Sequence, residues 1–273
     1  MRNSLIIIIS LTGALLLGEA CTPEYKQYTQ WSRKGTISQK DSAAFYFYNR
    51  GDYEKASFLF EDLQNAYRGG ERAKTILYHY AYSKYKFGLY VVAAYYFEQF
   101  TKLYPSDDLT AECSFMIGYC YYLESAPHYL DQTFTDKAIS QFQLFVNNYP
   151  KSDKVDECNK LMTELRERKA KKAFESAKLY YKVGNHRAAV TALKVLIQEF
   201  SDSRYREEAM YLLFRSSVEL ADVSVNSKKK NRYLDALDYY TSFVDRYPNS
   251  VYLKEAEAVY MKAQKSLEKF VQS

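Results

Sequence analysis

Apolar residues recur along the chain at a fixed spacing, and they predict a series of helices. In five places an alanine is followed four residues later by a large apolar side chain: Ala56 and Phe60, Ala93 and Phe97, Ala138 and Phe142, Ala189 and Leu193, Ala236 and Tyr240. In three of these units a glycine stands five residues before the alanine, at Gly51, Gly88 and Gly184. A glycine in that position favours a turn between two helices, so each unit is expected to be a helix pair.

A break follows twelve residues after each of the last four alanines. Proline lacks a backbone N–H and disfavours helix in the residue before it, so these breaks predict helix ends. They read Tyr104-Pro105, Tyr149-Pro150, Phe200-Ser201 and Tyr247-Pro248, whereas Arg68 stands in the proline position of the first unit. Two residues later, Asp or Ser is expected to cap the next helix: Asp107, Ser152, Ser203 and Ser250. Eight residues later, a small side chain suits close packing of helices: Cys113, Cys158, Ala209 and Ala256.

The units are longer than a simple tetratricopeptide repeat of about 34 residues. Successive alanines lie 37 to 51 residues apart, and the excess is assigned to two insertions, Glu124 to Thr135 and Asn226 to Arg232. The apolar face of one pair can be covered only by its neighbours, so pairs in series bury one continuous core and leave a concave side for binding. We therefore predict an all-α, tetratricopeptide-repeat superhelical solenoid of five helix pairs plus a C-terminal capping helix.

The N-terminus predicts export. Arg2 precedes an uncharged apolar stretch from Leu5 to Leu17, which is shorter than the about 20 residues that a transmembrane helix needs. Residues 1–20 are interpreted as a signal peptide and residues 21–35 as a lipidated linker. The sequence Leu17-Gly18-Glu19-Ala20-Cys21 is similar to a bacterial lipobox, although the leucine is one place early and Glu19 is unusual there. Lipidation of Cys21 is expected to tether the protein to the outer membrane, facing the periplasm; the alternative is an ordinary signal peptide cut near Ala20.

Charge and cysteine content add little chemistry. The formal net charge of +5 fits a solvated helical surface, and nucleic acid is not expected as a partner of an exported chain. Cys113 and Cys120 are two helical turns apart, too far for a disulfide within one helix, so small buried thiols are expected. A bridge between either of them and Cys158 stays open.

No catalytic pattern is present in the sequence. The histidines His79, His128 and His186 lie in different repeats without a partner at metal-ligand spacing. No phosphate loop, dinucleotide fingerprint or nucleophile elbow occurs. We expect neither a metal nor another cofactor, and the protein is not predicted to be an enzyme.

Tyrosine is the conspicuous residue, with 29 copies, many of them on the first helix of a pair. Aligning the units places one set of aromatic residues at or near the positions that face the inner groove of tetratricopeptide folds: Tyr48, Tyr78, Tyr82, Tyr85, Phe115, Tyr119 and Tyr122. Exposed tyrosines would bind an extended or helical peptide through ring faces and hydroxyl groups. The alternative is a core stripe, but Leu77, Tyr80 and Ala81 can supply the packing face instead.

The lipobox, the five repeats, of which three end in Tyr-Pro, and the inserted Asp131-Gln132-x-x-Thr135 together resemble the BamD family, lipoproteins of the β-barrel assembly machinery. The resemblance covers the mature chain and implies a scaffold, not an enzyme. Residues 36–169, repeats 1–3, would receive targeting strands of unfolded outer-membrane proteins, with residues 36–125 forming the groove. Residues 170–273, repeats 4–5 and the capping helix, would dock the barrel insertase through its periplasmic domains. Position and charge suggest the docking candidates Lys178, Lys182, Arg204, Arg206 and Arg215.

Two other functions share parts of this pattern. A periplasmic tetratricopeptide adaptor for cell-envelope synthesis or division would have the same fold and export signal. An enzyme of the α-superhelical type would need a catalytic domain for which the repeats leave no room. The repeat number and the insertion in the third repeat favour the assembly scaffold.

Overall fold

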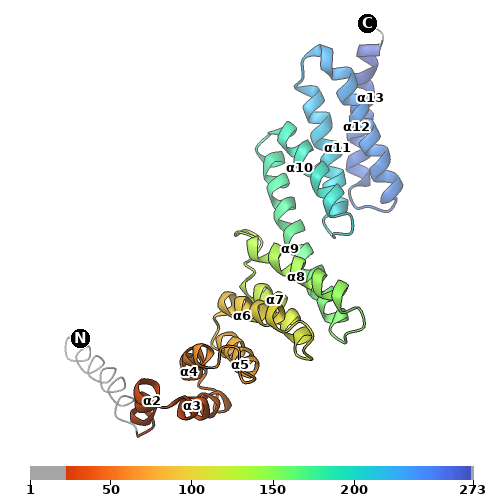
Figure 1. The fold of residues 1–273 in the computed structure, drawn as a ribbon. Coiled ribbons are helices and arrows are strands. Elements are labelled where there is room, and N and C mark those ends of the chain that lie inside the picture. The colour runs from red at the N-terminus through yellow and green to blue at the C-terminus, as the bar shows by residue number, and fades with distance from the viewer. Residues whose placement is uncertain (1–22, 272–273) are drawn as a thin grey trace, which may run out of the picture. The chain divides into compact units, whose positions relative to one another are not determined.

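A computed structural model describes residues 23–271, which form twelve α-helices and no strand (Figure 1). The predicted signal peptide and Cys21 lie outside the described residues. Contacts divide the chain into two compact units. Among the described residues, unit 1 comprises residues 23–125 and 133–158, and unit 2 comprises residues 126–132 and 159–271.

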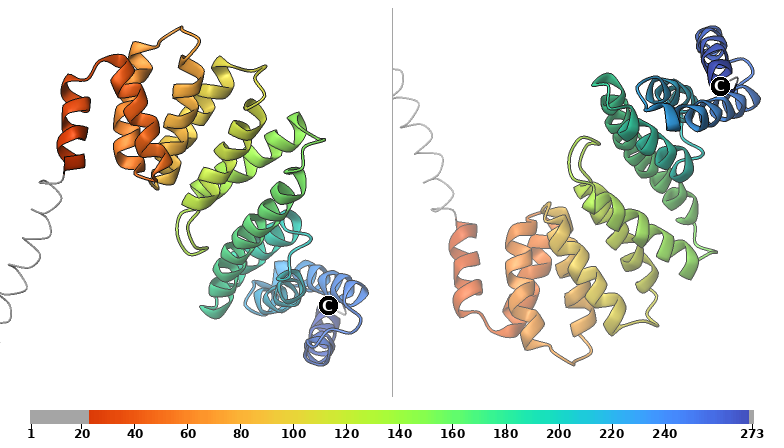
Figure 2. Two further views of the ribbon diagram at one scale, coloured as in Figure 1. Left: turned by 90° about the horizontal axis from the view of Figure 1, so that it is seen from below. Right: turned by 90° about the horizontal axis from the view of Figure 1, so that it is seen from above.

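Unit 1 holds the first three helix pairs. Successive helices pack side by side in antiparallel fashion (Figure 2). The pairs are α3 (Ile37–Asn49) with α4 (Tyr53–Ala66), α5 (Ala73–Lys86) with α6 (Tyr90–Leu103), and α7 (Thr110–Glu124) with α8 (Thr133–Asn148). The segment expected as a linker is itself helical. This helix, α2 (Pro23–Lys34), packs on the first pair, and the ring centroids of Tyr28 and Phe47 are 5.4 Å apart.

Unit 2 holds the other pairs and the last helix. They are α9 (Val155–Lys182) with α10 (His186–Glu199), α11 (Arg206–Asp222) with α12 (Asn226–Arg246), and the capping helix α13 (Leu253–Val271). Helix α9 begins in unit 1 and continues into unit 2. The predicted all-α tetratricopeptide fold, with five helix pairs and a C-terminal helix, is confirmed.

The predicted glycine turns join the helices of three pairs. Gly51, Gly88 and Gly184 have φ angles of 81°, 86° and 73°, which residues with a Cβ rarely adopt. In the first of these turns the N–H of Asp52 donates to the carbonyl of Phe47 at 2.9 Å, which closes the end of α3. The Asp52 side chain then accepts from the N–H of Lys55 and starts α4, so one short turn ends one helix and begins the next.

The Tyr-Pro breaks also end helices where the sequence predicts. Helices α6, α8, α10 and α12 each stop one residue before the first residue of the break. The expected caps are different, however, since each following helix starts three residues beyond the Asp or Ser. Ser203 Oγ, for example, accepts from the N–H of Tyr205 at 3.3 Å, so it stabilises the turn ahead of α11 and not the helix itself.

The repeated alanines form the centre of the core. All five have no exposed surface, and neither do the four small residues after the breaks, Cys113, Cys158, Ala209 and Ala256. The large residues four places after the alanines are also fully buried, except for the half-buried Tyr240. At Gly118 on α7, an added Cβ would lie 2.7 Å from the ring of Phe142, so only glycine allows this approach.

The insertion in the third repeat is a compact loop built around one amide. Gln132 is 8% exposed, and its Nε2 donates to the carbonyls of Pro127 at 2.9 Å and Leu130 at 3.1 Å. The hydroxyl groups of Ser125 and Thr135 lie 2.6 Å apart where the chain enters and leaves the loop. The Asp-Gln-x-x-Thr motif is therefore explained by loop closure.

The second predicted insertion is helical. Residues Asn226 to Arg232 form the first turns of α12, which is 21 residues long, whereas the second helices α4, α6 and α10 have 14 residues each. The sequence analysis did not assign the extra length of α9, which has 28 residues.

The three cysteines of the described chain are buried and unbonded, as expected for small packing residues. Burial raises the pKa of the Cys120 thiol to about 12 and that of Cys158 to about 11, so both stay protonated. Among residues 23–271, no helix has both the length and the apolar character to cross a bilayer.

Candidate functional site

An aromatic surface follows the first helices of repeats 1 to 3, all within unit 1. Tyr78, Tyr82 and Tyr85 share one face of α5, while α3 contributes Tyr48 and α7 contributes two more rings. We call the connected set the aromatic row: Tyr48, His79, Tyr78, Tyr82, Tyr85, Tyr119 and Tyr122. All its members are half-buried.

The rings of the row contact one another across three helices. Tyr48 on α3 lies 5.1 Å from His79, which lies 5.3 Å from Tyr78, between ring centroids. Along α5 the Tyr78–Tyr82 and Tyr82–Tyr85 separations are 4.8 and 6.2 Å. Tyr85 then lies 6.3 Å from Tyr119 on α7, and Tyr119 lies 5.9 Å from Tyr122. The tertiary structure thus joins the separate stripes into one surface.

The packing face of α5 is formed by the three residues that the sequence analysis named for it, and not by the tyrosine stripe. Leu77, Tyr80 and Ala81 are 6%, 2% and 0% exposed, so they fill the core and leave the tyrosine stripe at the surface. Phe115 is the exception among the predicted contacts. It is only 6% exposed and lies between the rings of Phe142 and Phe145, so its assignment as a peptide contact was wrong.

Glu112 ties the middle of the row to the next repeat. Its carboxylate accepts hydrogen bonds from the hydroxyl groups of Tyr78, at 3.1 Å, and of Tyr82. Burial, together with this carboxylate, raises the pKa of both tyrosines above their usual range, so their hydroxyl groups stay protonated and continue to donate. The carboxylate fixes two ring orientations before any ligand arrives.

His79 is uncharged at neutral pH. Its Nδ1 donates to the Thr75 carbonyl at 2.8 Å, and burial lowers its pKa. The ring therefore adds an aromatic edge between Tyr48 and Tyr78 without adding positive charge. The row as a whole is apolar and hydroxyl-bearing, with one carboxylate at its centre.

The sequence analysis did not include four residues of this surface among the candidate contacts: His79, Glu112, Tyr53 and Tyr90. Tyr53 lies 5.6 Å from Tyr48, and Tyr90 lies 5.8 Å from Tyr85, so both turn tyrosines flank the row. The Gly-x-Tyr pattern of the first two repeats was the available signal, because it places a ring beside the ends of α3 and α5.

The arrangement presents groups that are suited to binding. Hydroxyl donors, ring faces and one carboxylate are the groups a polypeptide backbone and its apolar side chains can use. In the part of the chain that the structure describes, no three His, Cys, Asp or Glu residues gather as metal ligands would.

Most of the docking candidates in unit 2 are already paired within the protein. Lys178 Nζ lies 2.7 Å from Glu208, and Arg204 Nε lies 3.3 Å from Glu167. Arg215 donates to Tyr211 at 3.1 Å and to Glu255. Lys178 and Arg215 thus join helices of unit 2, and Arg204 joins the turn before α11 to α9.

The other two candidates differ from these. Lys182 is exposed at the end of α9. Arg206 donates through Nη1 to the carbonyl of Ser201 at 2.5 Å. Arg206 also lines a pocket of unit 2.

A glutamate stands seven residues after the second residue of each break, at Glu112, Glu157, Glu208 and Glu255. Glu112 accepts from α5, Glu208 from α9 and Glu255 from α11, and each donor lies on the first helix of the preceding repeat. Glu157 differs, because it pairs with the nearby Lys154 at 2.8 Å. Three of the four glutamates therefore fasten successive repeats.

Comparisons with known proteins point to one family. The model of the YfiO family, described as outer membrane lipoprotein, matches residues 38–231, and a tetratricopeptide repeat model matches residues 225–250. The outer membrane protein assembly factor BamD of Caulobacter vibrioides is 21% identical over 165 residues, which are 60% of this chain and 54% of that protein. The match thus spans about half the length of this curated relative.

Among solved structures, the TPR2AB-domain:pHSP90 complex of yeast Sti1 is similar with a TM-score of 0.40 and 15% identity, covering 84% of this chain and 98% of that one. The YfiO match, by contrast, extends over well more than half of the chain, from the first helix pair into α12. This chain therefore belongs to the YfiO family of outer membrane lipoproteins.

Proposed function

We propose that this protein is a lipid-anchored scaffold of outer-membrane β-barrel assembly, which faces the periplasm and binds segments of unfolded barrel proteins on its aromatic row. Repeats 4 and 5 then dock the barrel insertase. Membership of the YfiO family and the similarity to the Caulobacter outer membrane protein assembly factor support this proposal.

The aromatic row is the observation that carries the proposal. A barrel strand alternates apolar and polar side chains, and an unfolded one presents apolar groups together with unpaired backbone N–H and C=O groups. Half-buried tyrosines suit both, because ring faces take apolar side chains while hydroxyl groups reach the backbone. Tyr85 and Tyr119 bridge α5 and α7, so a bound segment would cross two repeats.

Preorganisation favours affinity at this surface. Tyr78 and Tyr82 are held by Glu112, and the neighbouring rings restrict one another. Side chains that are already ordered lose little conformational entropy on binding, which otherwise costs about 0.5–1.5 kcal/mol per mobile side chain. The carboxylate also disfavours acidic segments near these rings.

Site-specific crosslinking in cells tests this function. A photoreactive residue replacing Tyr85 or Tyr119 is expected to capture precursors of many barrel proteins, identified by mass spectrometry. The matched control is Tyr95, which is 53% exposed on α6, a second helix of the same unit. Capture of wall-synthesis or division enzymes from positions 85 and 119, without barrel precursors, would favour the envelope adaptor and contradict the proposal.

A variant provides the quantitative counterpart. The double change Tyr85→Ala with Tyr119→Ala removes the bridge between the two helices and is expected to weaken binding of an unfolded barrel segment about tenfold to a hundredfold. Tyr95→Ala should change affinity less than about twofold. Fluorescence anisotropy with a labelled C-terminal barrel peptide measures the affinity, and circular dichroism verifies that both variants keep their helices.

A further inference from the structure

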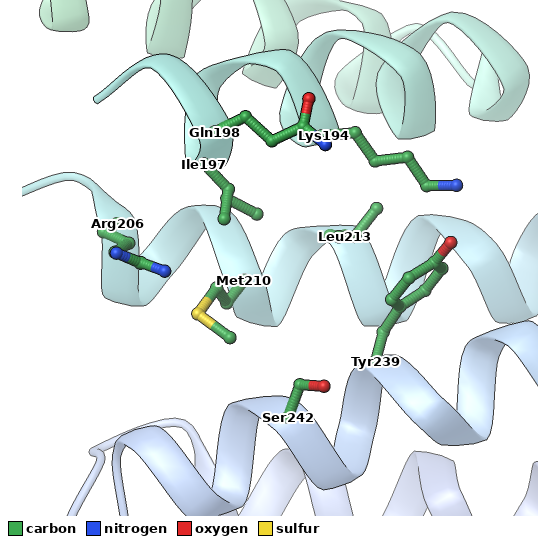
Figure 3. Close-up of a pocket in the computed structure, with 8 residues that line it drawn as sticks. All are labelled: Lys194, Ile197, Gln198, Arg206, Met210, Leu213, Tyr239 and Ser242. Atoms are coloured by element: carbon green, nitrogen blue, oxygen red, sulfur yellow. The ribbon is translucent and has the colours of Figure 1, made fainter. Parts of the chain in front are cut away.

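Unit 2 contains a pocket that the aromatic row does not involve. It has a volume of about 410 Å³ and lies where α10, α11 and α12 meet (Figure 3). Helix α11 supplies its floor and the other two helices its walls. The eight lining residues are Lys194, Ile197, Gln198, Arg206, Met210, Leu213, Tyr239 and Ser242.

The floor of the pocket is an apolar stripe with a cation at each end. Arg206, Met210 and Leu213 follow one another at i, i+4 and i+7 on α11, so they share one helical face about 10 Å long. Figure 3 shows Arg206 at one end of this stripe, and Lys194 beside Tyr239 at the other. Lys194 Nζ lies 4.9 Å from the centroid of the Tyr239 ring.

The two charges have no carboxylate partner among the lining residues. Arg206 donates through Nη1 to the Ser201 carbonyl, but its Nε is buried without a hydrogen-bond partner. Asp202, close to Arg206 in the sequence, faces Arg166 of α9 at 3.6 Å. A buried donor left without an acceptor costs free energy, which an incoming anionic group would recover.

We propose that this pocket binds an acidic segment of a partner protein, anchored by a large apolar side chain between two carboxylates. The apolar side chain would lie on Met210 and Leu213 against Tyr239, with one carboxylate accepting from Arg206 and the other facing Lys194. Extended chain advances about 3.3 Å per residue, so a floor of about 10 Å places the two acidic residues roughly three positions apart. Charges of one sign at both ends of an apolar floor suit this pattern and disfavour basic segments.

The inference refines the docking half of the proposed function and rests on it only for the partner's place in the cell. Of the five docking candidates, Arg206 alone lines the pocket. The pocket lies wholly in unit 2, whereas the aromatic row lies in unit 1. Absence of binding at one surface therefore does not contradict the proposal for the other.

Peptide binding to the whole chain, purified in detergent, tests the pocket directly. The probe is a fluorescein-labelled seven-residue peptide with the centre Asp-Leu-Phe-Glu, compared with one in which Asn and Gln replace the acids and one in which glycines replace Leu-Phe. We expect the first peptide to bind at least about tenfold more tightly than either comparison peptide, and its affinity to fall as salt is raised. Equal binding of the acidic and neutral peptides would overturn the proposal.

Variants locate the binding. Lys194→Glu, an exposed change that leaves the floor intact, and Arg206→Gln are each expected to weaken binding about tenfold. Lys254→Glu is the matched control, because it makes the same charge change on an exposed lysine of unit 2 outside the pocket. If Lys254→Glu weakens binding as much as Lys194→Glu, the attraction is general and the pocket is not the site. Circular dichroism and barrel levels in cells, measured on the same variants, separate loss of the pocket from loss of fold or of barrel assembly.

Discussion

At the scale of single residues, unit 1 uses polar atoms to orient aromatic rings. Tyr80 is 2% exposed, and its hydroxyl still donates to Glu61 at 3.0 Å. His79 and Glu112 play comparable parts in the row, one by contact between rings and the other by accepting hydroxyl protons. An aromatic side chain with a satisfied polar end can fill a core and still present a fixed edge to a ligand.

His79 makes stability sensitive to acid. Burial, with Arg72 nearby, lowers its folded pKa below the ordinary value of 6.5, so the unfolded chain takes up this proton more readily than the folded one. The free energy of unfolding should therefore decrease as pH falls through 6.5 toward the lowered folded pKa. Urea unfolding at pH 7.5 and 5.5 is expected to show a larger loss for the natural protein than for His79→Phe. Equal losses would show that His79 does not carry this effect.

At the scale of elements, short polar segments decide how helices are joined. The glycine turns and the Tyr-Pro breaks act locally, whereas the loop of the third repeat depends on a buried amide and on α9. Lys172 Nζ donates to the Leu130 carbonyl at 2.7 Å, which fastens the loop to that helix. The loop is a defined element and not a flexible insertion between repeats.

Gln132 is expected to account for much of the loop's stability. Gln132→Leu keeps the approximate size but removes the hydrogen bonds to the carbonyls of Pro127 and Leu130, which should cost about 1–3 kcal/mol. The control is Gln143→Leu, on the exposed side of α8, where Gln143 bonds only to Asn147 in the same helix turn. That change should stay within about 0.5 kcal/mol. Urea unfolding measures both, and similar values for the two variants would refute the central role of Gln132.

Several element boundaries followed from local chemistry, and others did not. The turn at Gly88 and the end of α6 before Tyr104 depend on residues within one turn of the chain, so both were predictable. The length of α12 and the helix α2 were missed. A polar run such as Asn226 to Arg232 can be loop or exposed helix, and only packing of the rest of the helix decides which.

At the scale of the whole molecule, the chain combines two surfaces in separate units. The aromatic row of unit 1 is uncharged except for Glu112, and the pocket of unit 2 is lined by Lys194 and Arg206. We therefore expect the aromatic row to prefer apolar segments and the pocket to prefer acidic segments. Such a division allows one scaffold to hold two different polypeptides.

Membrane attachment is expected to depend on Cys21. Buried acyl chains contribute about 0.8 kcal/mol per methylene, so two or more chains would hold the protein firmly. Cys21→Ala should move the protein from the membrane fraction to the soluble fraction, as judged by immunoblotting after fractionation. Cys158→Ala is the control, because alanine fills the equivalent position in later repeats. Unchanged membrane association of Cys21→Ala would contradict lipid anchoring.

The sequence by itself determined the repeat, because each signal acts over one or two helical turns: the alanines, the glycine turns and the breaks. It also proposed seven aromatic residues of first helices as candidate contacts and left open whether they belong to the core; six of them are half-buried. Only the tertiary structure decided that Phe115 is core, that His79 connects α3 to α5 and that Glu112 accepts from the preceding repeat. The physical reason is distance along the chain: Tyr78 and Glu112 are 34 residues apart, and contacts of that range depend on how helices stack. The pocket of unit 2 arises in the same way, from three helices whose separate sequences carry no common pattern.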